Sequence, residues 1–291
     1  MEKYIKIIRK NFPDLHFTRV NDSSDGIDYV VLILDGKYVF RFPKKDHYKK
    51  VIQTEMKLLD TLQGLPVPHY LWKGKDFGGY QIIKGNPLTL RRYKLIKNKE
   101  KLHREIASFL TKLHSKKTFP GLKKQKLAQS ITLLDSRMKI IKKYLTKEQI
   151  LFTKKYLKIA KKIIFPSYCI THADLHYSHI LVDKEFKGVI DFSDAEIGDP
   201  AIDFHSFWLY GKQAVEDIYQ KYKGPKDPSF LYRSQLYHYT DYLSALYHSH
   251  ASNKLSWRKG VLRRIKKIID KELKLSNYTK NFSKCNKKIE K

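Results

Sequence analysis

The sequence is poor in the residues and runs that mark secreted or membrane-spanning proteins. Only two cysteines, Cys169 and Cys285, occur in 291 residues, which excludes a disulfide framework and suits a reducing compartment. No apolar run approaches the roughly 20 residues of a membrane span. The first ten residues, M-E-K-Y-I-K-I-I-R-K, carry too much charge for a secretion signal. We therefore expect a cytoplasmic protein that does not bind a membrane.

Acidic residues are also scarce. The chain has 29 Asp and Glu against 59 Lys and Arg, a formal net charge of +30. Such a balance can indicate attraction to nucleic acid, to an anionic membrane or to a nucleotide. Because the lysines are spread along the chain rather than confined to one tail, a compositional bias of the surface is the simpler interpretation. The 42% apolar and 13% aromatic residues indicate a folded chain of one or two domains.

Glycine is missing where a phosphate-binding loop would normally use it. The segment N-D-S-S-D-G-I-D at residues 21–28 precedes a strand pattern and contains only Gly26. Backbone N–H groups around Ser24 and Gly26 could still cover the phosphates of a nucleotide. The same segment also fits an ordinary polar turn, and the residues alone leave both interpretations open.

The N-terminal third predicts a short helix at residues 1–10 and then a β-hairpin. The strand-like runs Tyr29–Leu34 and Tyr38–Phe42 are joined by Asp35 and Gly36, a pair that favours a tight turn. A helix should follow Pro43 and continue through Leu62.

Glu55 falls on the apolar stripe of this helix and should need a partner. Arg41 points away from the aromatic face of its strand and is the natural candidate. The pair would correspond to the strand lysine and helix glutamate of kinases, with Arg in place of Lys. The alternative is that both side chains lie on the surface.

A strand-like run at Tyr80–Ile83 is followed by a Gly- and Pro-containing turn, Lys84–Pro87, which predicts a hinge between two lobes. We expect these lobes at residues 1–84 and 85–291. The backbone of Gln81 to Ile83 could bind the edge of a purine, although these residues could equally belong to the core. Apolar periodicity beyond the hinge predicts helices at residues 99–115, 130–164 (as two helices), 207–222, 230–248 and 253–275. In the last of these, the inward positions should be Leu262, Ile265, Ile269 and Leu273.

Polar side chains converge on a second predicted hairpin. Its strands are Ile180–Val182 and Val189–Ile190, with a turn at Lys184–Lys187. The residues His172, Asp174, His176 and His179 precede the first strand, and Asp191 ends the second. Gathering carboxylates and imidazoles in one place is costly unless a cation binds there.

The spacing of these residues favours phosphoryl transfer. The catalytic loop of kinases places an Asp two residues after a His and a metal ligand five residues after that Asp. His172, Asp174 and His179 have this spacing, with His in place of the usual Asn, and Asp191 would supply the second ligand. We therefore predict Asp174 and His172 as catalytic residues, and His179 and Asp191 as ligands of Mg²⁺.

The same segment allows other interpretations. A lone H-x-D is common by chance, and three histidines in this order could suggest zinc. The zinc hypothesis lacks a cysteine or a helical i, i+4 pair. For His176 we favour a role in orienting the loop. Asp199, ahead of Pro200, and Asp203 are interpreted as structural, with Asp199 capping a helix.

Taken together, these segments resemble the antibiotic phosphotransferases of the aminoglycoside and macrolide type over about residues 23–222. The similarity is carried by V-F-R-F-P-K, I-I-K-G-N-P-L-T, F-L-T-K-L-H-S, T-H-A-D-L-H-Y-S-H-I-L-V-D and I-D-F-S-D-A-E-I-G-D-P-A-I-D-F. The resemblance implies an α+β, protein-kinase-like fold with two lobes. A small N-terminal lobe would hold an antiparallel sheet, and a larger C-terminal lobe would be mostly helical.

The resemblance also implies roles for single residues. Asp174 would be the catalytic base, His179 and Asp191 would bind magnesium, and Arg41 would contact the nucleotide phosphates. Two positions depart from the family pattern. Ala173 replaces the Gly of H-G-D, which we expect to be harmless if its φ is negative. Arg41 keeps the charge of the usual Lys but has a different fork geometry.

The predicted function is transfer of the γ-phosphoryl group of ATP or GTP to a hydroxyl of a small molecule, as in antibiotic resistance by aminoglycoside or macrolide phosphorylation. One alternative is a kinase for a choline- or sugar-like metabolite. Another is a non-catalytic kinase-like protein that binds nucleic acid through its lysines, although nucleic acid is not the expected partner. A protein kinase is disfavoured because no A-P-E pattern follows Asp191. No oligomer is required.

Overall fold

The computed structural model describes residues 1–24, 26, 28–165 and 167–274, with side chains described up to position 270. The chain packs into two compact units. The first consists of residues 1–123, 170–197 and 216–224, and the second comprises the rest of the described chain. The predicted division after Lys84 stays a prediction.

The first unit contains the sheets. Its helices are α1 (Glu2–Asn11), α2 (His47–Asp60), α3 (Leu90–Leu95) and α4 (Lys99–His114). Its strands are β1 (Val20–Asp22), β2 (Tyr29–Leu34), β3 (Tyr38–Pro43), β4 (Tyr70–Lys73), β5 (Gly78–Gln81), β6 (Asn86–Pro87), β8 (Ile180–Val182) and β9 (Phe186–Val189). The predicted mixed α+β class, with an N-terminal antiparallel sheet, is confirmed.

Five antiparallel strands form the main sheet in the order β1-β2-β3-β5-β4. The predicted hairpin is confirmed, because β2 pairs with β3 from Tyr29 opposite Pro43 to Leu34 opposite Tyr38. Asp35 and Gly36 both have positive φ, 50° and 67°. Positive φ at both central residues is typical of a type I′ turn. The backbone twist of that turn matches the right-handed twist of the two strands that it joins.

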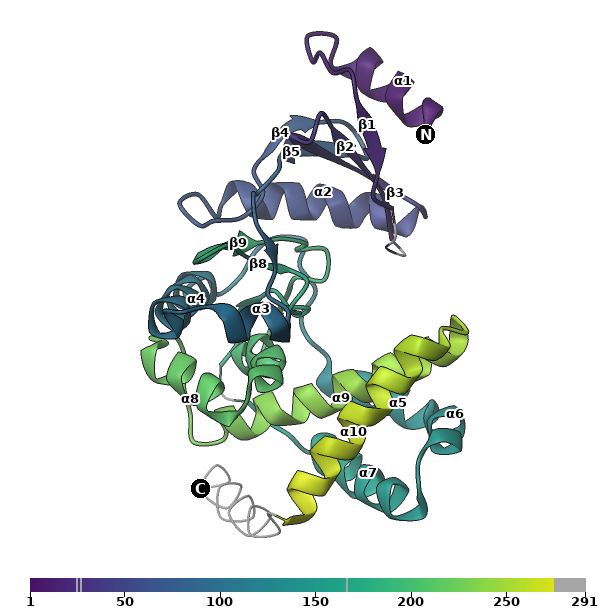
Figure 1. Ribbon diagram of the computed structural model, residues 1–291, viewed down its shortest axis with the longest axis vertical. Helices are drawn as coiled ribbons and strands as arrows, with labels where there is room; N and C mark the ends of the chain where they lie inside the picture. Colours follow the sequence, from purple (N-terminus) through teal and green to yellow (C-terminus); the bar gives the residue numbers. More distant parts are fainter. Residues whose placement is uncertain (25, 27, 166, 275–291) are drawn as a thin grey trace. The chain divides into compact units, whose positions relative to one another are not determined.

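The two faces of this sheet bury different partners. One face contributes Phe40 and Phe42 to a core that also holds Ile8 of α1. The other face packs against α2, which lies along the sheet (Figure 1). Because side chains alternate along a strand, Arg41 points toward α2. The predicted helices at residues 1–10 and after Pro43 are therefore both present as α1 and α2.

Strand β5 lies two residues earlier than the sequence predicted. It spans Gly78–Gln81 rather than Tyr80–Ile83. A Cβ on Gly79 would lie 2.5 Å from the ring of Phe40, so the strand needs glycine where propensity disfavours it. The predicted turn at the hinge is also partly wrong, since Asn86 and Pro87 form β6 and pair with β8.

The second predicted hairpin is present with a tighter turn. Strand β8 matches the prediction, but β9 begins at Phe186, and Val182 lies opposite Phe186. The predicted turn at Lys184–Lys187 was therefore placed too late. The ring of Phe186 packs edge-on against Phe109 of α4, which favours an extended conformation where the charged neighbours suggested a turn.

The second unit is helical. It contains α5 (Leu127–Ser136), α6 (Met138–Ile141), η1 (Lys142–Tyr144), α7 (Lys147–Ala160), η2 (Pro200–Tyr210), α9 (Phe230–Ala251) and α10 (Leu255–Lys274), and α9 packs against α10 (Figure 1). The elements β7 (Cys169–Thr171), β10 (Glu196–Gly198) and α8 (Lys212–Lys221) continue from one unit into the other along the chain.

Two predictions for the helices need correction. The helix expected at residues 207–222 is divided into η2 and α8 at Gly211, whose φ of 105° a helix cannot contain. In α10, Val261 is buried beside Ile265 and Ile269 in place of the predicted Leu262. The predicted inward position of Leu273 lies outside the described side chains. No described helix is both long and apolar enough to cross a membrane.

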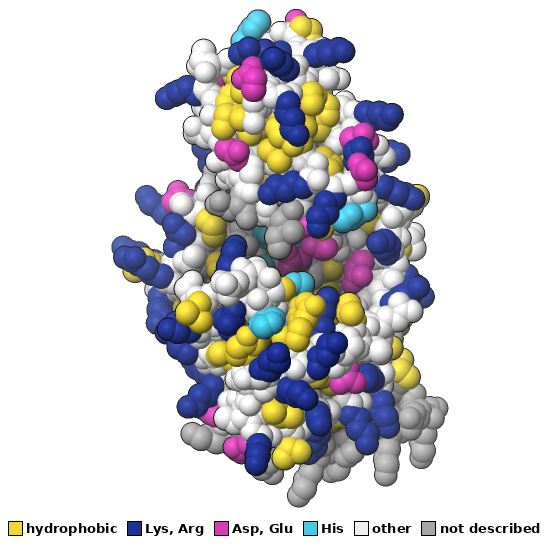
Figure 2. Space-filling model, turned by 90° about the vertical axis from the view of Figure 1, so that its right-hand side faces the viewer, with side chains coloured by type: hydrophobic (Ala, Val, Ile, Leu, Met, Phe, Trp, Pro, Cys, Tyr) yellow, Lys and Arg dark blue, Asp and Glu magenta, His cyan; other side chains and the backbone are white. Residues whose placement is uncertain are grey.

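The basic side chains are scattered over the face of the molecule drawn in Figure 2, with acidic side chains between them. This distribution fits a lysine-rich surface better than one dedicated basic patch on that face.

Candidate active site

His172 fixes the start of the loop that precedes β8. Its side chain is fully buried, and its Nε2 lies 3.0 Å from the carbonyl oxygen of Ile190. A carbonyl can only accept, so Nε2–H is the donor. The ring also packs on Phe192, with 4.6 Å between centroids. His172 therefore ties the loop to the residues after β9 and acts as a positioning residue.

The backbone is left-handed at two points of the site. Ala173 has a φ of 64° and Asp191 a φ of 67°. Non-glycine residues in this region cost about 1–3 kcal/mol and cluster at functional sites. The condition under which Ala173 would be harmless, a negative φ, is not met, because the chain turns sharply between buried His172 and the partly exposed Asp174.

His179 and Asp174 lie together beside β8. The Nδ1 of His179 is 2.8 Å from the backbone oxygen of Asp174 and 3.4 Å from its carboxylate. Because the backbone oxygen can only accept, Nδ1 carries a proton. The other ring nitrogen, Nε2, lies 3.7 Å from Oδ2 of Asp191. The three side chains that spacing predicted thus meet in the structure.

The two oxygens of Asp191 have different surroundings. Oδ1 accepts hydrogen bonds from Nη2 of Arg41 at 2.7 Å and from Oγ of Ser193 at 2.5 Å. Oδ2 faces His179. Burial alone would raise the pKa of Asp191, but Arg41, then His179 and Ser193, hold that pKa well below its usual range. Asp191 is therefore a carboxylate at neutral pH.

Arg41 connects the main sheet, α2 and the second hairpin. Its Nη1 donates to Oε1 of Glu55 at 2.6 Å, and its guanidinium lies 4.2 Å from the ring centroid of Tyr29. The side chain of Glu55 is fully buried. The predicted pair is confirmed, and the alternative of two surface residues is wrong. The second contact of Arg41, to Asp191, was not predicted from the sequence.

The loop before β2 is held by its own side chains. Oγ of Ser24 accepts from the backbone N of Val31 at 2.9 Å, and the backbone N of Ser24 donates to Asp22 at 2.9 Å. Lys44 donates to the carbonyl oxygens of Ser24 at 3.0 Å and Gly26 at 2.6 Å. No local sequence pattern predicts this role of Lys44, because its two acceptors lie 20 and 18 residues away along the chain.

Gln81 and Ile83 lie where the chain leaves the main sheet. Gln81 ends β5 opposite Tyr38, and the next residue, Ile82, donates to the carbonyl of Lys37 at 2.8 Å. Ile83 follows and is half-buried. Both residues lie within the first unit, just before the turn predicted at Lys84–Pro87.

His176 and Asp194 complete the surroundings. His176 bonds Ser178 through Nδ1 at 3.1 Å, and its backbone oxygen accepts from the N–H of His179, which fits a role in shaping the loop. Asp194 is exposed, but partial desolvation raises the pKa of its carboxyl group, and the charges of Asp191 and Asp28 raise that pKa further. Sequence reasoning missed Asp194, although a second Asp in D-F-S-D was its signal.

The donor set suits a magnesium ion held jointly with phosphate oxygens. Among the described residues, no three His, Cys, Asp or Glu side chains group so as to hold a metal alone. The ionised carboxylate of Asp191 is the type of ligand that magnesium prefers, and phosphate oxygens and water would complete the coordination shell. The predicted second ligand, His179, would offer a ring nitrogen, which is less usual for magnesium.

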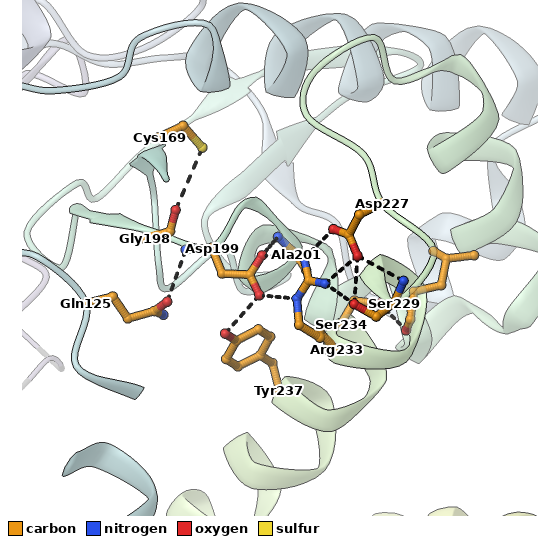
Figure 3. Close-up of polar contacts among 11 residues, drawn as sticks. Gln125, Cys169, Gly198, Asp199, Ala201, Asp227, Ser229, Arg233, Ser234 and Tyr237 are labelled. Carbon is orange, nitrogen blue, oxygen red and sulfur yellow. Dashed lines mark hydrogen bonds and ion pairs between the residues drawn. The ribbon is translucent and has the colours of Figure 1, made fainter. Parts of the chain in front are cut away.

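Asp199 and Asp203 lie in the second unit and are both buried. Asp199 caps η2 by accepting from the N–H of Ala201 at 3.1 Å, with Pro200 in the first turn, as predicted. Its carboxylate also binds Arg233 and Tyr237 (Figure 3). These contacts agree with a structural role for Asp199.

Comparisons with known proteins identify the family and the fold. The model of a family described as "Phosphotransferase enzyme family" matches residues 17–224. A search of curated proteins found no match. Among solved structures, the GDP and kanamycin complex of the aminoglycoside phosphotransferase APH(2″)-IIIa is similar at 20% identity, with a TM-score of 0.81, covering 93% of this chain and 99% of that one.

Two further structures show the range of the likeness. Macrolide 2′-phosphotransferase type I has 15% identity and a TM-score of 0.69, covering 91% of this chain and 96% of its own. The streptomycin–ATP ternary complex of APH(2″)-IIa has 20% identity and a TM-score of 0.66, covering 84% and 89%. At these identities the likeness establishes the fold, which is that of the antibiotic kinases.

Proposed function

Because this chain belongs to the phosphotransferase enzyme family, we propose that it transfers the γ-phosphoryl group of ATP or GTP to a hydroxyl of a small molecule. The observation that carries the proposal is the meeting of Asp174, His179 and Asp191 around one point. A base and two metal ligands at that spacing are what phosphoryl transfer requires.

In this proposal Asp174 is the general base. Its side chain is 45% exposed, so an acceptor hydroxyl can reach it. The backbone oxygen of the same residue holds the ring of His179, which keeps the base and the metal ligand in fixed relation. His172 holds the start of the same loop through the hydrogen bond from its Nε2 to the carbonyl oxygen of Ile190. Positioning of this kind supplies most of the catalysis in phosphoryl transfer.

The nucleotide would be held by residues of the first unit. His179 and Asp191 would bind a magnesium ion, which would neutralise charge on the phosphates. Arg41, kept in place by Glu55, would contact the same phosphates. The loop at Ser24 and Gly26 would cover them, and the backbone at Gln81 and Ile83 would meet the base. Both ATP and GTP remain in the proposal, because similar folds have been solved with GDP and with ATP.

For the acceptor we propose an aminoglycoside or macrolide antibiotic, in a cytoplasmic resistance enzyme. The support is the fold shared with a kanamycin complex and with a macrolide phosphotransferase. A thermal-shift screen with ATP, GTP, Mg²⁺ and an antibiotic panel, followed by phosphate-transfer assays on the hits, would identify the pair. A choline- or sugar-like metabolite that is phosphorylated faster than any antibiotic would overturn the choice of acceptor.

The role of Asp174 is tested by Asp174→Ala. Loss of a general base should lower kcat by roughly 10²–10⁴-fold, whereas nucleotide binding should stay nearly intact because the metal ligands remain. Transfer is measured under saturating nucleotide, and nucleotide affinity is measured by calorimetry. Asp183→Asn is the matched control, since Asp183 is exposed in the turn between β8 and β9. Activity of Asp174→Ala within a few-fold of wild type would refute the assignment.

A further inference from the structure

The carboxylate of Asp191 is asymmetric in a way that its assigned role as a metal ligand does not require. Oδ1 receives two hydrogen bonds, from Arg41 and from Ser193. Oδ2 lies 3.7 Å from Nε2 of His179 and receives no hydrogen bond from Arg41 or Ser193. A carboxylate oxygen has two in-plane lone pairs, so the two donors occupy Oδ1 and leave Oδ2 as the oxygen available to a cation.

The hydroxyl of Ser193 is oriented by the same contacts. Nη2 of Arg41 lies 3.3 Å from Oγ of Ser193, and a guanidinium can only donate. The single hydroxyl proton of Ser193 is therefore free to point at Oδ1 of Asp191. Arg41 itself cannot easily move away, because Glu55 and the ring of Tyr29 hold its guanidinium.

We propose that Ser193 is a positioning residue that makes Asp191 a one-oxygen ligand and thereby selects Mg²⁺ over Ca²⁺. The inference rests on the proposed function. Ser193 stands in D-F-S where the kinase motif D-F-G has glycine, which has no hydroxyl to supply. The hydroxyl of Ser193 therefore gives Asp191 a hydrogen bond that the glycine of the general motif cannot give.

The selectivity follows from the coordination preferences of the two ions. Ca²⁺ takes six to eight oxygens at about 2.3–2.6 Å and readily accepts both oxygens of one carboxylate. Mg²⁺ demands an octahedron at about 2.0–2.1 Å, in which a carboxylate contributes one oxygen. Because Arg41 and Ser193 hold Oδ1, Asp191 is disfavoured from binding one cation through both oxygens. The affinity for Ca²⁺ is lowered by the loss of one ligand, whereas the affinity for Mg²⁺ is not lowered.

The test compares the affinities of the Mg²⁺ and Ca²⁺ complexes of ATP and GTP, measured by calorimetry with non-transferable analogues so that no turnover is needed. In Ser193→Ala, Mg²⁺-dependent affinity should fall roughly 10-fold, the usual effect of losing a partner of a ligand. Ca²⁺-dependent affinity should hold or improve. Ser193→Gly should behave like Ser193→Ala, and Ser193→Thr, which keeps the hydroxyl, should restore the wild-type ratio.

Ser115→Ala serves as the control, because that hydroxyl bonds only a carbonyl of its own helix, that of Lys112. The ratio of its nucleotide affinity with Mg²⁺ to its nucleotide affinity with Ca²⁺ should equal that of wild type. If wild type binds nucleotide with Mg²⁺ and the ratio is unchanged in both Ser193→Ala and Ser193→Gly, the inference about Ser193 is overturned alone. If wild type shows no cation-dependent nucleotide binding at all, the proposed function fails and this inference fails with it.

Discussion

Two buried arginines, one in each unit, are each bonded to two carboxylates, yet their surroundings differ. Arg233 contacts Asp199 through Nε and Nη2 and Asp227 through Nη1 and Nη2, at 2.6 to 2.9 Å. Its Nη1 also bonds Ser229 (Figure 3). All five N–H groups of the guanidinium are thus used. The side chains of Arg233 and Asp199 are 2% and 0% exposed.

Arg41 has the same kind of partners in an open arrangement. Glu55 is as buried as Asp199, but the second partner, Asp191, has a side chain that is 38% exposed. Asp191 is also the residue whose backbone is left-handed and whose second oxygen faces His179. The comparison teaches that a buried ion pair serves structure when both carboxylates are enclosed. It can serve chemistry when one carboxylate keeps an oxygen toward solvent.

The sharpest way to test this difference is to neutralise one carboxylate in each cluster. Asp199→Asn leaves Arg233 under-compensated in a dry interior and should lower the free energy of unfolding by about 3–5 kcal/mol. Asp191→Asn should instead reduce phosphate transfer by roughly 10²–10³-fold, as for loss of an electrostatic stabiliser, with a smaller loss of stability. Urea unfolding and the transfer assay are run on both variants.

Each variant is the control for the other in that experiment. The contrast would be broken if Asp191→Asn destabilised the fold as much as Asp199→Asn. It would also be broken if Asp191→Asn kept full activity, since the exposed carboxylate would then have no chemical role.

A smaller effect is expected from changing the arginines to lysine. Arg233→Lys cannot reproduce five directed donors and should cost about 1.5–3 kcal/mol of unfolding free energy, the value for hydrogen bonds to charged groups. Arg41→Lys restores the usual kinase residue and should retain transfer, with the KM for nucleotide changed by no more than about 10-fold, or about 1.4 kcal/mol. Urea unfolding curves measure the effect of Arg233→Lys, and transfer assays over a range of nucleotide concentrations measure the effect of Arg41→Lys. If Arg41→Lys lost all transfer activity, the planar guanidinium group, and not only its positive charge, would be essential.

The sequence predicted the part of the site that local spacing determines. Asp174 and His179 lie in one short loop, so their separation along the chain limits their separation in space. The pairing of Arg41 with Glu55 followed from a simple rule, that a carboxylate on an apolar helix face needs a partner. The first hairpin followed from Asp35 and Gly36.

The remainder depends on contacts that no local pattern encodes. Arg41 and Asp191 are 150 residues apart in sequence, and their bond depends on how the main sheet meets the second hairpin. The positive φ of Ala173 results from the buried anchor at His172 rather than from alanine itself. The earlier start of β9 depends on the packing of Phe186 against α4. In each case tertiary structure overrides a local preference.

The smallest expected effect concerns the response of the enclosed cluster to acid. Burial alone would raise the pKa of Asp227, but hydrogen bonds from Arg233 and then Ser229 hold it below its usual value. A carboxyl group whose pKa is lower in the folded state stabilises the fold above its unfolded pKa, about 3.9. That stability is lost as the pH falls through the lower, folded value.

We therefore expect the difference in unfolding free energy between wild type and Asp227→Asn to be constant from about pH 7 to about pH 5. Below about pH 4 the difference should shrink, because wild type then binds a proton in the unfolded state that the variant cannot bind. Ser229→Ala removes a donor to Oδ1 of Asp227 and should bring the folded pKa of Asp227 closer to the unfolded one, so that the acid-dependent loss of stability becomes smaller and is complete at a higher pH. Urea unfolding at a series of pH values measures all three proteins. A difference that stays constant to pH 3 would show that Asp227 does not help to hold Arg233. Arg233 would then have one effective carboxylate partner, Asp199, and the contrast with Arg41 would lose its basis.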